Sequence, residues 1–260
     1  MEVVIVASAG EIGTLVADAV VQLLRRRPDA VLGLATGSSP LPVYAALVER
    51  VRAGDLSFAQ AQAFLLDEYI GLAPDHPQSY RAFIETHLSS QVDFRLGAVR
   101  GPDGDAADLL QACDDYEQAI VAAGGIDLQL LGVGADGHIG FNEPTSSLGS
   151  RTRLKTLTRQ TRDDNARFFE SPDEVPRHVI TQGVGTILGA RHLVLVANGE
   201  GKAAAIAAAV EGPVTAMCPA SALQLHPHAT VVVDEAAASR LTLAGYYRET
   251  YAAKPPWQPL

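Results

Sequence analysis

Short apolar runs alternate with amphipathic stretches along most of the chain. The runs are rich in Val, Ile and Leu, which is typical of buried strands. They span Val3–Ala7, Val31–Ala35, Ala63–Leu66, Ile126–Val133, Leu193–Ala197 and Thr230–Val233. Apolar residues recur at helical spacing over residues 12–24, 44–51, 109–120 and 202–210. Continuous apolar strands separated by helices predict an α/β fold, built on a mostly parallel sheet with helices on both faces.

The domain organisation follows from the same pattern. The chain contains no internal repeat and no linker-like stretch, so residues 1–260 are expected to form a single domain. Only the C-terminal segment AAKPPWQPL, at about residues 252–260, has the composition of an irregular tail.

Composition narrows the functional class. A hydrophobic fraction of 47% predicts a substantial core, and a net charge of −10 argues against general nucleic-acid binding. Cys113 and Cys218 show no metal or disulfide spacing, so we expect a reduced, cytoplasmic protein. The N-terminus does not resemble a signal peptide, and no apolar stretch reaches the roughly 18 residues of a membrane span. We therefore expect no membrane partner.

Two strand ends carry features suited to an anion, in the region where open α/β sheets bind ligands. In ATGSSP, residues 35–40, Gly37, Ser38 and Ser39 offer backbone N–H groups and hydroxyls. The alternative is an ordinary turn, with Ser39 as helix N-cap and Pro40 as the first helical residue. Lys202 follows glycines at a predicted helix start, where cation and helix dipole could face a phosphate. A solvated surface lysine is equally compatible with the pattern.

A basic stretch lies between these two segments. Six of the chain's 20 cations fall within residues 151–167, namely Arg151, Arg153, Lys155, Arg159, Arg162 and Arg167. In so acidic a protein, this clustering indicates an anionic ligand or a charged subunit contact.

Acid/base candidates occur at two further strand ends. Asp67 and Glu68 are predicted where a buried strand meets a loop, and a half-buried carboxylate there suits a general base. A helix cap or salt-bridge partner is the alternative.

The segment LGVGADGHIGFNEP, residues 131–144, combines Asp136, His138 and Glu143. An extended backbone would direct Asp136 and His138 to one side, so that the carboxylate orients the imidazole. Glu143 could add a second orienting carboxylate, while the glycines would leave room for a substrate. A metal site and a simple polar loop are the alternatives.

Taken together, these motifs resemble the glucosamine-6-phosphate deaminases. The resemblance runs from about residue 31 to residue 235 and is carried by ATGSSP, FLLDEYIGL, HPQSY, GVGADGHIGFNEP, SSLGSRTRLKTLT and LQLHP. It implies a Rossmann-like α/β fold and conversion of glucosamine 6-phosphate and water into fructose 6-phosphate and ammonia. It also implies that neither metal nor pyridoxal phosphate is required. The chain has TGSSP where TGGTP is commoner in that family, and GADGHIG where GNDGHIA is commoner.

The resemblance also implies residue roles. Asp67 would move a proton between C2 and C1 of the open-chain sugar, and His138, oriented by Asp136 and Glu143, would open the pyranose ring. The phosphate would be held by Gly37, Ser38, Ser39, Arg167 and Lys202. Ser146, Arg153 and Lys155 match a segment that binds N-acetylglucosamine 6-phosphate between subunits in regulated members, which implies a homo-oligomer. A solvated basic strand is the alternative for that segment.

Two rival functions remain open on the sequence. A 6-phosphogluconolactonase has the same fold and a similar GxxxDGH stretch, but it needs no aldose–ketose base, so LDEYIGL and FNEP favour the deaminase. A non-catalytic regulator that senses sugar phosphates would carry a DNA-binding helix-turn-helix module. This chain begins directly with a predicted strand, which favours the enzyme.

Overall fold

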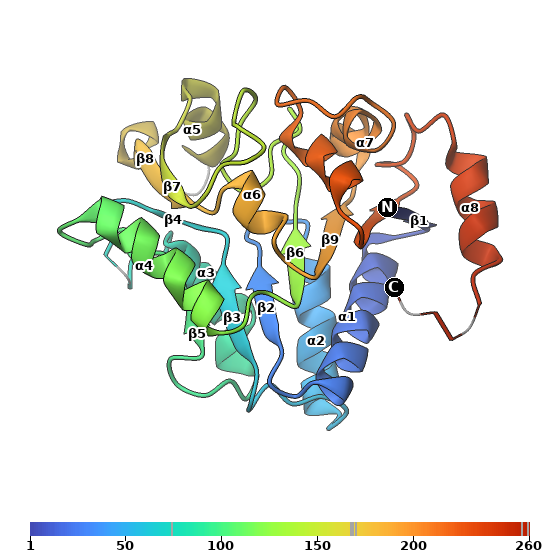
Figure 1. Cartoon of the computed structure of the whole chain (residues 1–260), viewed down its shortest axis with the longest axis horizontal. Coiled ribbons are helices and arrows are strands. Elements are labelled where there is room, and N and C mark those ends of the chain that lie inside the picture. The colour runs from blue at the N-terminus through green and yellow to red at the C-terminus, as the bar shows by residue number, and fades with distance from the viewer. Residues whose placement is uncertain (74, 167–168, 170, 256, 259) are drawn as a thin grey trace.

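A seven-stranded parallel sheet forms the centre of the molecule (Figure 1). The computed structural model describes residues 1–73, 75–166, 169, 171–255, 257–258 and 260. The strands are ordered β1-β10-β9-β6-β2-β3-β5, and every neighbouring pair is parallel. Their bounds are β1 Glu2–Val6, β2 Val31–Leu34, β3 Gln62–Leu65, β5 Val99–Arg100, β6 Leu128–Leu131, β9 His192–Ala197 and β10 Ala229–Asp234. All six predicted strands are present, and β5 is additional.

Helices cover both faces of this sheet, as the sequence predicts. One face packs against α1 (Ala9–Arg26), α2 (Leu41–Arg52) and α3 (Tyr80–His87). The other packs against α4 (Leu109–Ala122), α6 (Val184–Ile187), α7 (Ala203–Val210) and the 3-10 helix η5 (Pro219–Leu225). Helix α8 (Ala244–Ala252) lies beside the edge strand β1. The described residues also include the shorter 3-10 helices η1 (Ser89–Gln91), η3 (Pro172–Glu174) and η4 (Glu200–Lys202).

Helix α1 shows how local sequence produces this packing. Ser8 caps its N-terminus by accepting a hydrogen bond from the backbone N–H of Glu11, and Arg25 and Arg26 occupy its last turn. Its buried stripe includes Ile12, and burial of each such side chain contributes about 1.5–3 kcal/mol. A Cβ on Gly13 would lie 2.3 Å from the carbonyl oxygen of Pro42, so glycine allows α1 to approach α2 closely.

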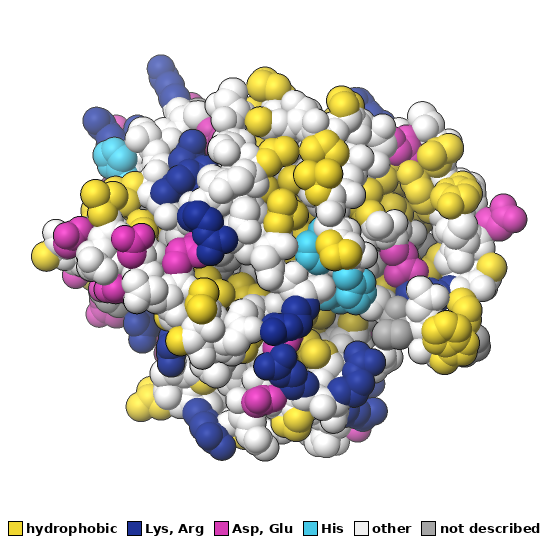
Figure 2. All heavy atoms as spheres, viewed as in Figure 1, with side chains coloured by type: hydrophobic (Ala, Val, Ile, Leu, Met, Phe, Trp, Pro, Cys, Tyr) yellow, Lys and Arg dark blue, Asp and Glu magenta, His cyan; other side chains and the backbone are white. Residues whose placement is uncertain are grey.

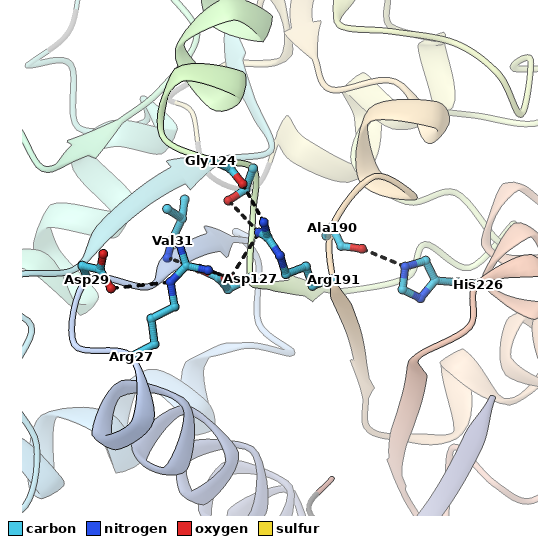
Figure 3. Close-up of polar contacts among 9 residues, drawn as sticks. Arg27, Asp29, Val31, Gly124, Asp127, Ala190, Arg191 and His226 are labelled. Carbon is cyan, nitrogen blue, oxygen red and sulfur yellow. Dashed lines mark hydrogen bonds and ion pairs between the residues drawn. The ribbon is translucent and has the colours of Figure 1, made fainter.

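A charged cluster ties the sheet together at the N-terminal ends of its strands (Figure 3). The Asp127 carboxylate, which precedes β6, lies 2.6 Å from Arg27 Nη1 and 3.2 Å from Arg191 Nη1. It also accepts a hydrogen bond from the backbone N–H of Val31 at 2.8 Å. Arg191 additionally donates to the carbonyl of Gly124. These contacts join the starts of β2, β6 and β9 at the edge opposite the strands' carboxyl ends.

A second sheet, which the sequence pattern did not predict, stands beside the carboxyl ends of the central strands. It is antiparallel, in the order β4-β8-β7, with β4 at Asp67–Tyr69, β7 at Arg153–Thr156 and β8 at His178–Thr181. Helix α5 (Arg159–Asn165) follows β7. Asp67 was expected at a junction of strand and loop. It instead begins β4, opposite Thr181.

Beyond α8, two described residues of the C-terminal segment tie it to the domain. Lys254 Nζ lies 2.8 Å from Glu2 Oε2, and Leu260 packs against the hydrophobic core. Among the described helices, none has the length and apolar character needed to cross a membrane.

The molecular surface mixes charges of both signs. On the face shown in Figure 2, described Lys and Arg side chains are interspersed with acidic and apolar ones, and they form no continuous basic stripe. This distribution agrees with the overall net charge of −10.

Candidate active site

A pocket of about 460 Å³ lies at the carboxyl ends of β2, β3 and β6. From β2 the chain runs outward through β3 to β5, and it then returns to place β6 on the other side of β2. Strand order therefore reverses between β2 and β6, which is where open α/β sheets bind ligands. The volume is in the range of small-molecule sites. Asp67, His138, Gly37, Ser38, Ser39 and Lys202 all line this pocket.

Asp67 is an almost buried carboxyl group on the pocket wall. Only 5% of the residue is exposed. Burial raises the pKa of Asp67 well above its usual value, and the neighbouring charge of Glu68 raises it further. A carboxyl group with a raised pKa can take up and return a proton near neutral pH, which is the property that a general base requires. The carboxyl group is more completely buried than the half-buried position that the sequence suggested.

His138 and Asp136 form a pair, although not for the reason that the sequence suggested. His138 Nδ1 lies 2.7 Å from Asp136 Oδ1. The backbone between them is a turn rather than an extended segment, because Gly137 has φ +87° and its N–H donates to the carbonyl of Gly134. The pairing lowers the pKa of Asp136, chiefly through its hydrogen bond with His138. The carboxylate also accepts a hydrogen bond from the backbone N–H of His138 at 3.2 Å. With Nδ1 facing the carboxylate at ion-pair distance, Nε2 is the ring nitrogen left for a substrate.

The glycines of this loop make room for protein atoms rather than only for a substrate, which corrects the sequence interpretation. The His138 ring covers Gly134, where a Cβ would lie 2.1 Å from Cε1. A Cβ on Gly137 would lie 2.6 Å from Cys218 Sγ. At Gly140, with φ +54°, a Cβ would lie 2.9 Å from Thr181 Oγ1. These glycines therefore permit the close packing that holds His138 in place.

Glu143 makes a different contact from the predicted one. It is buried and accepts a short hydrogen bond from the hydroxyl of Thr161, a pocket-lining residue of α5. Within the described contacts, none joins Glu143 to His138, so the expected direct orienting contact is absent there. Glu143 instead connects the loop that carries His138 to the helix above the pocket.

The predicted anion loop lies at one end of the pocket. Gly37 has φ +96°, a left-handed conformation that glycine adopts without strain. Tyr44 of α2 holds the base of the loop by donating to the carbonyl of Ala35 at 2.6 Å and accepting from its N–H. Helix α2 begins at Leu41 without a side-chain cap, so Ser39 does not serve as the N-cap. Lys202, at the end of η4, lines the same pocket, whereas Arg167 lies outside the described residues.

An aromatic wall completes the pocket, and it was missed in the sequence interpretation. Tyr69, Tyr80, Phe141 and Phe169 all line the cavity. The Tyr80 and Phe141 rings stack with centroids 5.9 Å apart, and the Tyr69 and Tyr80 hydroxyls lie 3.3 Å apart. LDEY, HPQSY and GFNEP contain three of these residues, but aromatic side chains in short motifs cannot be distinguished from core residues by pattern alone.

The residues of the expected activator segment have individual surroundings. Ser146 is buried, and its Oγ has no hydrogen-bond partner within the described structure. Arg153 donates to Asn142 Oδ1 at 2.8 Å, and burial lowers the pKa of its guanidinium. Lys155 is half-buried on β7.

Two other cations of the basic stretch also have acidic partners. Arg151 pairs with Glu117, and Arg159 lies 3.9 Å from Asp163. Arg151, Arg153 and Arg159 therefore each have a partner of their own.

A metal centre was the alternative use of Asp136, His138 and Glu143. In the part of the chain that the structure describes, no group of three or more His, Cys, Asp or Glu side chains could hold a metal ion.

Comparison with known sequences identifies the family. The sequence model of the glucosamine-6-phosphate isomerases/6-phosphogluconolactonase family matches residues 6–233. The chain belongs to this family. Within it, a glucosamine-6-phosphate deaminase of Streptomyces coelicolor is 64% identical over 259 residues, covering 99% of both chains. A glucosamine-6-phosphate deaminase of Mycolicibacterium smegmatis is 62% identical, again over 99% of both chains.

Solved structures of the family share the fold. A structure described as a monomeric glucosamine-6-phosphate deaminase has a TM-score of 0.90 and 40% identity, covering 92% of this chain and all of that one. The 6-phosphogluconolactonase of Trypanosoma cruzi has a TM-score of 0.73 at 20% identity, covering 93% and 97%. At that identity, the second likeness shows the fold alone.

Proposed function

We propose that this chain is a glucosamine-6-phosphate deaminase, which converts glucosamine 6-phosphate and water into fructose 6-phosphate and ammonia. The observation that carries the proposal is the joint presence of Asp67 and the His138–Asp136 pair in one pocket. An aldose–ketose rearrangement needs a base at carbon, and ring opening needs a second proton carrier at oxygen. The high identity to deaminases over the whole chain supports the same conclusion.

The proposed reaction begins with the phosphate at the Gly37–Ser39 loop. Backbone N–H groups and hydroxyls of this loop, with Lys202, provide donors for the phosphate oxygens. We assign Arg167 to the same phosphate on the family resemblance. Anchoring the phosphate directs the sugar carbons along the pocket toward Asp67 and His138.

Ring opening comes next and is assigned to His138. The proton of the anomeric hydroxyl is removed while O5 gains a proton, so one imidazole can serve both transfers. Asp136 fixes the tautomer by holding Nδ1 and stabilises the imidazolium form. Glu143 supports this loop indirectly through Thr161.

Isomerisation and release of ammonia follow. The Asp67 carboxylate takes the C2 proton while the C1 carbonyl oxygen gains a proton, which gives an enolamine. Return of the proton from Asp67 to C1, with loss of one proton from the amine nitrogen, then gives an imine at C2. The resulting C2 imine adds water and loses ammonia, which leaves the ketone of fructose 6-phosphate. The balance needs water alone as a co-reactant.

A comparison of two substrates tests this proposal. Purified protein is incubated with glucosamine 6-phosphate or with 6-phosphogluconolactone, and ammonia, fructose 6-phosphate and lactone hydrolysis are followed. We expect ammonia and fructose 6-phosphate in equal amounts and little enzymatic lactone hydrolysis. Hydrolysis of the lactone without ammonia release would favour the lactonase, and binding of the sugar phosphate without turnover would favour the regulator.

The same proposal includes a partner and a location. We infer a homo-oligomer that binds N-acetylglucosamine 6-phosphate at Ser146, Arg153 and Lys155. The buried, unpartnered Ser146 Oγ supports a polar ligand there. Residues 1–260 would act as one domain, because the tail is tied to β1 by Lys254. Two free, buried cysteines suit a reducing compartment such as the cytoplasm.

A further inference from the structure

Glu68 is a buried carboxylate that the proposed mechanism does not use. Only 8% of the residue is exposed. Its Oε1 accepts hydrogen bonds from the backbone N–H groups of Tyr69 at 2.8 Å and Tyr80 at 3.0 Å. Its Oε2 accepts from the N–H of Arg81 at 2.9 Å. Three backbone donors on one carboxylate satisfy a group that would otherwise be costly to bury.

These donors belong to two different elements. Tyr69 is on β4, whereas Tyr80 and Arg81 are the first two residues of α3, which lies side by side with β4 (Figure 1). The N-terminus of a helix favours a negative charge, so the carboxylate is placed where the α3 dipole stabilises it. Glu68 thus fastens the strand that carries Asp67 to the helix that carries Tyr80.

Both ends of this connection reach the pocket. Asp67 precedes Glu68 in the chain, and Tyr80 lines the cavity, where it stacks on Phe141. The distance from the base to the aromatic wall therefore depends on the Glu68 contacts. A sugar held between Asp67 and that wall would have its C1 and C2 positioned by this distance.

We propose that Glu68 is a positioning residue for the isomerisation step, which fixes α3 and the aromatic wall relative to Asp67 and supplies a negative charge beside that base. The inference deepens the proposed deaminase function and rests on it. Burial raises the pKa of Glu68 as well, while the backbone N–H groups of Tyr80, Arg81 and Tyr69 oppose that rise. When Glu68 is ionised, its charge contributes to the raised pKa of Asp67. The titratable and charged groups next to this pair are Tyr69 on β4, Tyr80 and Arg81 on α3, and Tyr116 on α4. His138 and Lys202 line the same pocket as Asp67.

Two variants of Glu68 distinguish the effect of its charge from the effect of its side-chain length. Glu68→Gln removes the charge but keeps a carbonyl oxygen for Tyr69 and Tyr80. Glu68→Asp keeps the charge but shortens the side chain by about 1.5 Å, one carbon–carbon bond. Glu85→Gln is the matched control, because Glu85 is an exposed residue of the same helix and the net charge changes equally.

The test measures pH profiles of kcat/KM and kcat for ammonia release, with backbone amide exchange over residues 78–84. We expect the acid limb of Glu68→Gln to move to lower pH, because loss of the neighbouring charge lowers the pKa of Asp67. We expect Glu68→Asp to keep the wild-type limb, to lose about 10- to 100-fold in kcat, and to exchange the Tyr80 and Arg81 amides faster. Glu85→Gln should match wild type throughout.

Profiles of Glu68→Gln that superimpose on the control, together with unchanged exchange and kcat in Glu68→Asp, would overturn the positioning role. In Glu68→Gln, a fall in activity with an unmoved acid limb would show that the charge of Glu68 does not act on Asp67, and it would equally overturn the proposal. An inactive wild-type enzyme would overturn the proposed function itself, and this role with it. Amide exchange over residues 78–84 shows whether Glu68 holds α3 against β4, and this measurement does not depend on turnover.

Discussion

At the scale of single residues, the site illustrates how burial sets chemical function. Asp67 and Asp136 are both carboxylates, yet burial raises the pKa of the first, whereas pairing with His138 lowers that of the second. The sequence indicated both residues, because each follows a predicted buried strand. It could not indicate the turn at Gly137, since a positive φ there depends on the packing of Cys218 against the loop.

The pKa of Asp67 has a consequence for stability. An acid whose pKa is raised by folding stabilises the fold while protonated, and this contribution is lost as pH rises from the ordinary carboxyl pKa through the raised one. Asp67→Asn cannot ionise, so we expect it to have a higher Tm than wild type at pH 7. The difference should narrow toward pH 5.

Thermal unfolding between pH 5 and pH 8 measures this difference, and Asp105→Asn is an exposed control. An Asp67→Asn variant that is less stable than wild type at pH 7, or a Tm difference that does not change with pH, would contradict the conclusion that burial raises the pKa of Asp67.

His138 should matter most when the sugar is cyclic. His138→Gln removes the proton carrier for ring opening, and we expect a loss of about 10²–10⁴-fold with glucosamine 6-phosphate. An analogue that cannot close the ring bypasses this step and should lose less. Steady-state kinetics of wild type and His138→Gln with each substrate measure the two losses in kcat/KM. Equal losses would show that His138 does not act in ring opening.

At the scale of elements, the parallel sheet could be predicted and the small antiparallel sheet could not. Buried parallel strands such as β9 are continuous apolar runs, whereas β7 has the sequence RLKT and resembles a solvated segment. The three-residue β4 is too short to leave a pattern. The strand ends that converge on the pocket followed from the α/β topology, but the aromatic wall and the Thr161–Glu143 contact required three-dimensional packing.

The start of α7 should control substrate affinity. Lys202 lies there with its side chain on the pocket, so Lys202→Ala should raise KM about 10- to 100-fold through loss of a charge-assisted contact. The value of kcat should change much less. Arg240→Ala removes an exposed cation away from the pocket and is the control. Equal KM values in the two variants would remove Lys202 from the phosphate site.

At the scale of the whole molecule, the one-domain fold places every proposed site on the same side of the sheet. The carboxyl ends of the strands carry the pocket, and Arg153 contacts Asn142, which immediately precedes Glu143 in the chain. The opposite edge carries the Asp127 cluster, which joins three strands. The cluster that joins the strands and the pocket therefore lie at opposite ends of the sheet.

Regulation is a property of the assembled molecule. We expect wild type to sediment as an oligomer and to show a sigmoidal substrate curve that N-acetylglucosamine 6-phosphate shifts to lower concentration, at a coupling of roughly 1–3 kcal/mol. Arg153→Ala should abolish the shift. A relative at 40% identity is described as monomeric, so sedimentation is needed to decide whether this protein forms an oligomer. A monomer, or kinetics indifferent to the ligand and to Arg153→Ala, would contradict the regulatory prediction.

The most direct test of the central claim compares wild type and Asp67→Asn with glucosamine 6-phosphate in a coupled assay for ammonia. The wild-type enzyme should release ammonia, and the variant should lose about 10²–10⁴-fold in kcat, the range for a positioned general base. Substrate binding, measured by calorimetry, should be nearly unchanged, because the phosphate is held at the Gly37–Ser39 loop and Lys202. Ammonia release by Asp67→Asn at close to the wild-type rate would contradict the account.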